Sequence, residues 1–118
     1  AAAAAAFLDA GSAAAAAFLD AGAQNVILSM GKDGAIVAGS GELLHLQPPT
    51  VTVKTAVGAG DAVVAGAVWA LLQGLPTREV GLWGVTTGTV TAMHDDLQPQ
   101  NRAELDAVQQ QVTVRVLA

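Results

Sequence analysis

A lone carboxylate, Asp61, follows the glycine-rich stretch 57–60 (Val-Gly-Ala-Gly) and opens a run of small residues with helical spacing. The first turn of a helix carries unpaired amide groups and a partial positive charge, and both attract anions. Gly58 and Gly60 let the backbone approach a ligand closely, and Ala59 between them adds little bulk. The stretch therefore predicts an anion site suited to a phosphoryl group. The carboxylate beside it can take a proton from an attacking hydroxyl.

The same pattern has a purely structural interpretation, in which Asp61 caps the helix that begins there. An Asp at a helix N-cap stabilises a protein by roughly 1 kcal/mol. The stretch is not a Walker phosphate loop, because Gly-Lys-Ser/Thr is missing at the required spacing. It is not a dinucleotide-binding fingerprint either, since the third glycine, Gly66, comes too late. The pattern alone leaves capping and catalysis both open for Asp61.

The elements that would position this stretch alternate between strands and helices. Apolar or alternating runs predict strands at 25–30, 35–39, 43–47, 50–53 and 112–116. Helical spacing predicts helices at 61–74, 76–93 and 101–111. The Gly-Lys-Asp-Gly segment at 31–34 predicts a tight turn that joins the first two strands into a hairpin. This succession favours an α/β layered fold.

The beginning of the chain contains a perfect repeat, because the Ala-rich segment 2–11 recurs letter for letter at 13–22. Gly11 and Ser12 read as a helix stop followed by a new N-cap, which predicts two short Ala-rich helices. The alternative is that some of these alanines stand in place of side chains whose identity is not established. Residues 1–12 are therefore an Ala-rich segment of doubtful identity, and residues 13–118 form the domain in which we look for function.

The composition excludes several classes of protein. Hydrophobic residues make up 53% of the 118 residues and charged residues 13%, which favours a packed core over a disordered chain. The net charge is −5 and the five Lys and Arg residues do not cluster, so we expect no nucleic-acid partner. No segment is apolar enough to predict a membrane partner. The absence of Cys excludes disulfides and thiolate metal sites and fits a cytoplasmic protein.

A family resemblance connects the glycine stretch with its surroundings. Residues 53–74, VKTAVGAGDAVVAGAVWALLQG, resemble the second signature of the ribokinase/PfkB carbohydrate kinase family, which places Gly-Ala-Gly-Asp at a helix start after a strand. Residues 25–38, NVILSMGKDGAIVA, are similar to the family's Ser-x-Gly-x-x-Gly hairpin. Val57, PPTVTVKTAVGAGD (48–61) and QPQNRAELDAVQQQVTVRVL (98–117) look most like the branch of 1-phosphofructokinases and tagatose-6-phosphate kinases. The resemblance covers roughly residues 13–118 and implies the C-terminal part of a ribokinase-like layered sandwich.

The resemblance implies a phosphoryl-transfer role for the glycine stretch. Asp61 would be the catalytic base that deprotonates the sugar hydroxyl. Gly58, Ala59 and Gly60 would form the anion hole for the transferred γ-phosphate. Val63 departs from the Phe or Met that is more usual in the family, so one wall of the pocket is expected to differ.

The resemblance also implies a nucleotide side of the site and its cofactors. Ser29, Gly31 and Gly34 would line the ATP side of the cleft, and Lys32 is either near the ATP phosphates or simply solvated. The cofactors would be ATP and Mg²⁺, which bridges the nucleotide phosphates. We expect no metal-ligating residues in this chain. The implied reaction transfers phosphate from ATP to a phosphorylated sugar, such as fructose 1-phosphate.

Two other functions remain open at this point. The chain could be a non-catalytic fragment that binds nucleotide weakly, or a kinase that acts on an unphosphorylated sugar or a nucleoside. Family members are much longer than this chain, and their sugar-binding residues lie mainly upstream of the matching region. A missing N-terminal part or a partner chain is therefore expected to complete the fold.

The remaining aromatic and imidazole side chains have structural explanations. His45 is expected on a sheet face and His94 at the end of a helix, rather than at a metal. Trp69 and Trp83 lie in helices rich in Ala and Gly, so both are expected to pack in the core. The functional alternatives are an ATP-side role for His94 and an adenine contact for either tryptophan.

Overall fold

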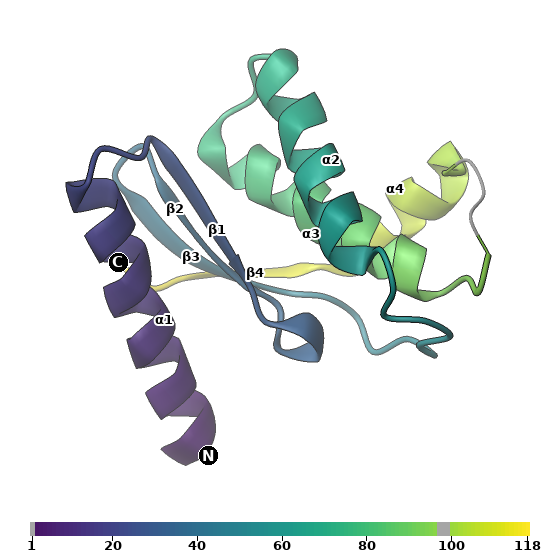
Figure 1. Cartoon of the computed structure of the whole chain (residues 1–118), viewed down its shortest axis with the longest axis horizontal. Helices are drawn as coiled ribbons and strands as arrows, with labels where there is room; N and C mark the ends of the chain where they lie inside the picture. Colours follow the sequence, from purple (N-terminus) through teal and green to yellow (C-terminus); the bar gives the residue numbers. More distant parts are fainter. Residues whose placement is uncertain (1, 97–99) are drawn as a thin grey trace.

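A four-stranded antiparallel sheet forms the centre of the molecule (Figure 1). The structure is a computed structural model that describes residues 2–96 and 100–118, without the side chains of residues 2–7. The strands lie in the order β1 (Asn25–Ser29), β2 (Ala35–Gly39), β3 (Glu42–Gln47) and β4 (Thr113–Val116). A 3-10 turn, η1 (Gly31–Asp33), joins β1 to β2, so the predicted hairpin is confirmed.

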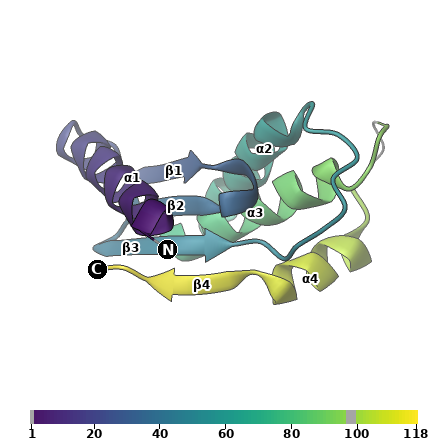
Figure 2. The ribbon, with the colours of Figure 1, turned by 90° about the horizontal axis from the view of Figure 1, so that it is seen from below.

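The helices form layers on the two faces of this sheet. Helix α1 (Ala2–Asp20) packs against β1 and β2, and helix α3 (Thr77–Ala92) packs against the opposite face. Helix α2 (Ala59–Leu72) packs along α3, and helix α4 (Arg102–Gln111) lies beside α3, near the end of α3, before the chain returns as β4 (Figure 2). The expected α/β layered architecture is present. In the described part of the chain, no helix has both the length and the apolar character needed to cross a membrane.

The core lies on both faces of β2, which explains why every residue of this strand is buried. Ile36 and Ala38 face α1, whereas Ala35 and Val37 face α3. On the α3 side, Gly81 allows the close approach, because a Cβ there would lie 2.5 Å from a methyl carbon of Val37. A strand covered on both faces has a continuous apolar sequence rather than an alternating one.

Small residues set the distance between α2 and α3. A Cβ on Gly66 would overlap Thr87 Oγ1 and would lie 2.5 Å from the carbonyl oxygen of Trp83. A Cβ on Gly88 would lie 2.6 Å from a methyl carbon of Val63. The two helices therefore approach to a separation that only glycine permits at these positions.

Two expectations about secondary structure are wrong. Residues 2–20 form one helix rather than two, because Gly11 packs against Ile36 and the Ser12 hydroxyl donates to the Leu8 carbonyl within the helix. Residue 1 of the Ala-rich segment lies outside the described residues. The expected strand 50–53 is irregular, since the chain after Pro48 and Pro49 runs toward α2 without joining the sheet.

Candidate phosphoryl-transfer site

The glycine stretch forms an open turn at the start of α2. Gly58 is the N-cap of the helix and has a φ of 82°, a left-handed conformation that favours glycine. A Cβ built on Gly58 or on Gly60 would meet nothing within 4 Å. The turn is supported from within, since the amide of Val57 donates to Thr55 Oγ1 at 3.0 Å. The structure therefore leaves space beside both glycines, as an anion site requires.

Asp61 is exposed and lies in the first turn of α2, as the third residue of the helix. The helix begins at Ala59, two residues earlier than expected, and its N-cap is Gly58. The interpretation of Asp61 as the N-cap is therefore wrong. A carboxylate at this position still interacts favourably with the partial positive charge of the helix start.

An open apolar groove runs from Asp61 along the outer face of α2. The residues that line it are Asp61, Val64, Ala65, Val68, Trp69 and Leu72. Leu72 is 79% exposed, and Trp69 is 42% exposed. The expectation that Trp69 packs in the core is therefore wrong, although its ring edge contacts Trp83, which is buried as expected.

The predicted nucleotide-side residues lie together around η1, but they differ in their surroundings. Ser29 is exposed at the end of β1, and a Cβ on Gly31 would meet nothing within 4 Å. Gly34 is buried, and a Cβ there would overlap the carbonyl oxygen of Leu46. Gly31 is thus open to a ligand, whereas Gly34 is required for the turn to fold back onto β3.

The two turns lie at the same end of the molecule. Figure 2 shows that β1 runs into η1 and that β3 runs into the segment leading to α2, both on the side where α3 ends. The segment before α2 is tied there, because the amides of Lys54 and Thr55 donate to the carbonyl oxygen of Ala92 at 2.8 and 3.3 Å. The fold therefore places the predicted anion turn and the predicted nucleotide turn at one end.

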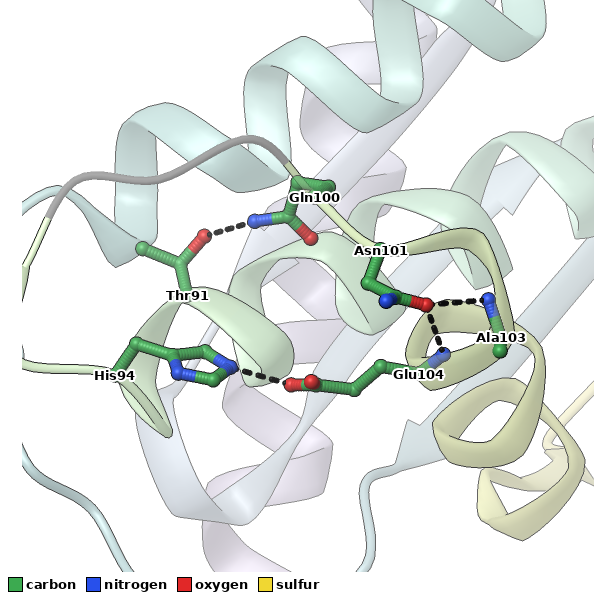
Figure 3. A network of polar contacts seen from close by, with 6 residues as sticks. All are labelled: Thr91, His94, Gln100, Asn101, Ala103 and Glu104. Carbon is green, nitrogen blue, oxygen red and sulfur yellow. Dashed lines mark hydrogen bonds and ion pairs between the residues drawn. The ribbon is translucent and has the colours of Figure 1, made fainter.

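His94 belongs to a polar network that joins the end of α3 to the start of α4 (Figure 3). Its Nε2 lies 2.6 Å from Glu104 Oε1, and both side chains are about two-thirds buried. Asn101 caps α4, because its Oδ1 accepts from the amides of Ala103 and Glu104. Within residues 2–96 and 100–118, no three His, Asp or Glu side chains gather where they could hold a metal ion.

Two side chains of β3 contact η1, and neither contact was predicted from the sequence. His45 Nε2 lies 2.7 Å from the carbonyl oxygen of Asp33, and Gln47 Nε2 donates to the carbonyl oxygen of Lys32 at 2.7 Å. The available signal was their spacing, since residues two apart on a strand share a face. What the sequence could not reveal is that the turn folds back within reach of that face.

The known sequences that are similar to this chain indicate one protein family. The model of the pfkB family carbohydrate kinases matches residues 4–103. The chain is 29% identical to a 1-phosphofructokinase of Vibrio cholerae over 94 residues, which is 80% of this chain and 30% of that protein. It is 39% identical to a 1-phosphofructokinase of Borreliella burgdorferi over 75 residues, which is 63% of this chain and 24% of that protein.

Solved structures show the same likeness in three dimensions. A candidate phosphofructokinase from Staphylococcus aureus superposes with a TM-score of 0.78 and 36% identity, covering 87% of this chain and 33% of the other. A ribokinase from Thermotoga maritima superposes with a TM-score of 0.72 and 25% identity, covering 84% of this chain and 34% of the other. The ribokinase-like fold is therefore confirmed, and the chain spans less than a third of the curated relatives described above.

Proposed function

The chain belongs to the pfkB family of carbohydrate kinases, and from this premise we propose that it takes part in ATP-dependent phosphorylation of a sugar phosphate. Fructose 1-phosphate is the proposed acceptor, because the relatives named above are 1-phosphofructokinases. The observation that carries the proposal is the position of Asp61, exposed in the first turn of α2 beside an open glycine turn. The reaction would take place in the cytoplasm, where ATP and sugar phosphates are made.

In the proposed reaction, a sugar hydroxyl attacks the γ-phosphorus of ATP and ADP leaves. A new bond forms between the sugar oxygen and phosphorus, the bond between the β–γ bridging oxygen and phosphorus breaks, and the hydroxyl proton passes to the Asp61 carboxylate. The backbone at Gly58, Ala59 and Gly60 is proposed to hold the phosphoryl oxygens, helped by the partial positive charge of the helix start. The open space beside both glycines supports this assignment.

The nucleotide is proposed to lie along the hairpin side of the site. Ser29, Gly31 and Gly34 would line this side, Gly31 through its open backbone and Gly34 by allowing the turn to close. Magnesium is assigned to the MgATP substrate, because in phosphoryl transfer the ion is held largely by the nucleotide phosphates. When bound to the phosphates, magnesium would neutralise part of their negative charge.

The proposed function depends on a part of the pfkB fold that lies outside this chain. The large apolar side chains on the outer face of α2 would be costly to leave in water, and the groove they line begins at Asp61. We assign this face to the remainder of a pfkB fold, supplied upstream or by a partner chain. That remainder would bring the groups that hold the acceptor against Asp61.

A binding and transfer experiment tests this function. The 118-residue chain, alone and together with the upstream part of a pfkB kinase, is mixed with MgATP and, in turn, fructose 1-phosphate, fructose, ribose or adenosine. ³¹P NMR then follows ATP binding and the appearance of a new phosphate ester. Transfer to fructose 1-phosphate in preference to the others supports the proposal. Transfer to another acceptor overturns the acceptor assignment, and absence of MgATP binding overturns the nucleotide assignment.

The apolar face of α2 favours a second candidate, a fragment that binds nucleotide without catalysis. Leu72 and Val64 are 79% and 61% exposed, so the face of α2 beside the proposed acceptor position is not covered by other parts of the chain that the structure describes. Binding of MgATP with no transfer to any of the four acceptors, even in the presence of the upstream part of a pfkB kinase, would support this candidate. Restoration of transfer on addition of the upstream part of a pfkB kinase would instead return the assignment to a complete enzyme.

A further inference from the structure

Two polar side chains on one face of β3 hold the turn between β1 and β2. His45 and Gln47 are two residues apart, so their side chains leave the strand on the same face. The carbonyl oxygens that they contact, those of Asp33 and Lys32, are consecutive in η1. Both distances are 2.7 Å, within the range of a direct hydrogen bond.

The direction of these bonds follows from the acceptors. A carbonyl oxygen only accepts hydrogen bonds, so Nε2 of His45 must carry a proton, as Nε2 of Gln47 always does. The neighbours Leu44 and Leu46 are completely buried on the α3 side of the sheet, and this fixes the strand and thereby the face that His45 and Gln47 share. The two donors therefore extend from a strand whose intervening side chains are completely buried.

The turn is also held by its own backbone. The amide of Met30 donates to the carbonyl of Gly34 at 2.7 Å, and the amide of Gly34 donates to the carbonyl of Gly31 at 3.0 Å. These bonds close the turn but do not orient it relative to the sheet. The contacts from His45 and Gln47 supply that orientation, because they tie two peptide planes of η1 to β3.

We propose that His45 and Gln47 are positioning residues for nucleotide binding, which hold η1 in the orientation that presents Gly31 to ATP. This inference rests on the proposed function, in which η1 lines the nucleotide side. Neither side chain touches the nucleotide in this proposal. Their effect reaches the ligand through the carbonyls of Lys32 and Asp33, so it acts on ATP affinity and leaves the chemistry at Asp61 unchanged.

The test measures binding of MgATP to the 118-residue chain by isothermal titration calorimetry. His45→Ala and Gln47→Leu each remove a donor without adding charge, and we expect each to weaken binding by about three- to tenfold. His45→Gln and Gln47→His keep a neutral side chain with an N–H within reach, and we expect affinity close to that of the wild type. Thermal unfolding of every variant is followed by circular dichroism in parallel.

A matched control comes from helix α4. Gln111 Nε2 donates to the carbonyl of Ala107 at 3.1 Å, a bond of the same kind away from η1. Gln111→Leu removes that bond without adding charge, and we expect MgATP affinity to stay within about twofold of the wild type, below the effect of losing one hydrogen bond.

The outcomes separate this inference from the proposed function. If the wild-type chain binds MgATP and the His45→Ala and Gln47→Leu variants bind it equally well, the inference alone is overturned. The inference is also overturned if the donor-keeping variants lose as much MgATP affinity as the donor-removing ones. The same holds if affinity falls only in variants whose melting temperature falls, because the two residues would then act on stability alone. Failure of the wild-type chain to bind MgATP overturns the proposed function and the inference with it.

Discussion

Thr87 Oγ1 lies 2.6 Å from the carbonyl oxygen of Ala62, the residue that follows Asp61 in the chain. This contact joins α3 to the first turn of α2, at the level where the candidate base lies. The missing side chain of Gly66, one helical turn further on, makes room for the same threonine. The position of Asp61 is therefore set by α3 as well as by the glycine turn before it.

Replacing Thr87 by Val tests this contact, because Val keeps the shape of Thr and removes the hydroxyl. The Thr87 hydroxyl has one proton and also lies 2.9 and 3.1 Å from the carbonyl oxygens of Trp83 and Gly84 within α3. Because the oxygen of Ala62 on α2 is the nearest acceptor, we expect the free energy of unfolding to fall by about 1 kcal/mol when the hydroxyl is removed. Urea denaturation measures the change. Thr89→Val is the control, since the Thr89 hydroxyl donates only within α3, to the carbonyl of Val85. Equal losses in the two variants would contradict an interhelical role for Thr87.

Gly66 and Gly60 make a second comparison, because both lie in α2 and only one is packed. Gly66→Ala places a methyl group against Thr87 and Trp83, and we expect a loss of about 1–3 kcal/mol from overpacking. Gly60→Ala meets no neighbour, and we expect a gain of up to about 1 kcal/mol from the better helix propensity of Ala. Thermal unfolding measures both. A stable Gly66→Ala variant would show that the helices separate easily.

The sequence predicted the elements that depend on local signals. The strand 35–39 is confirmed with its exact limits, and α2, α3 and α4 agree within two residues, because apolar periodicity and turn residues encode them directly. The same signals misled at Gly11 and Ser12, where packing against Ile36 keeps α1 continuous. Local stop signals do not include the free energy gained from tertiary contacts, and here those contacts keep the helix continuous.

Only part of the candidate site could be predicted from the sequence, for a similar reason. The glycine turn and Asp61 could be proposed as a candidate site because their residue types and spacing lie within one short stretch of the sequence. His45 and Gln47 were not connected with the turn, because their contacts join residues 12 and 15 positions apart. Trp69 was misassigned because the pattern of α2 is that of a helix buried all round, whereas this chain covers one side of it.

Asn101 gives a third prediction, at the polar network of Figure 3. Its side chain accepts from two amides at the start of α4, so Asn101→Ala should lower the free energy of unfolding by about 1 kcal/mol. Asn101→Asp keeps the acceptor, and we expect a stability close to that of the wild type. Urea denaturation distinguishes them. A neutral Asn101→Ala variant would mean that the network around His94 and Glu104 holds α4 without the cap.

The apolar face of α2 gives a fourth prediction. Val68 and Leu72 line the open groove, so the double variant Val68→Lys, Leu72→Lys should reduce binding of the dye ANS severalfold. Because both side chains are exposed, we expect its melting temperature to stay within a few degrees of the wild type. Gln73→Lys and Gln110→Lys together add the same charge outside the groove. Equal ANS binding in both double variants would contradict an exposed apolar face.

Asp61→Asn separates the catalytic role of this residue from a structural one. Asn has nearly the same size and can still accept hydrogen bonds near a helix start, but it cannot take a proton. We therefore expect turnover to fall by about 10²- to 10⁴-fold, the usual contribution of a general base, while folding and ATP affinity change little.

The measurement needs a complete enzyme, so residues 13–118 are joined to the upstream part of the 1-phosphofructokinase of Borreliella burgdorferi. Release of ADP with fructose 1-phosphate then reports turnover, and Asp20→Asn, an exposed carboxylate at the end of α1, is the control. A chimera that is active with Asp61 and nearly inactive with Asn at this position assigns the base to Asp61. Substantial activity in the Asn variant removes Asp61 from that role, because the carboxylate is the one group of the glycine turn that can accept the proton.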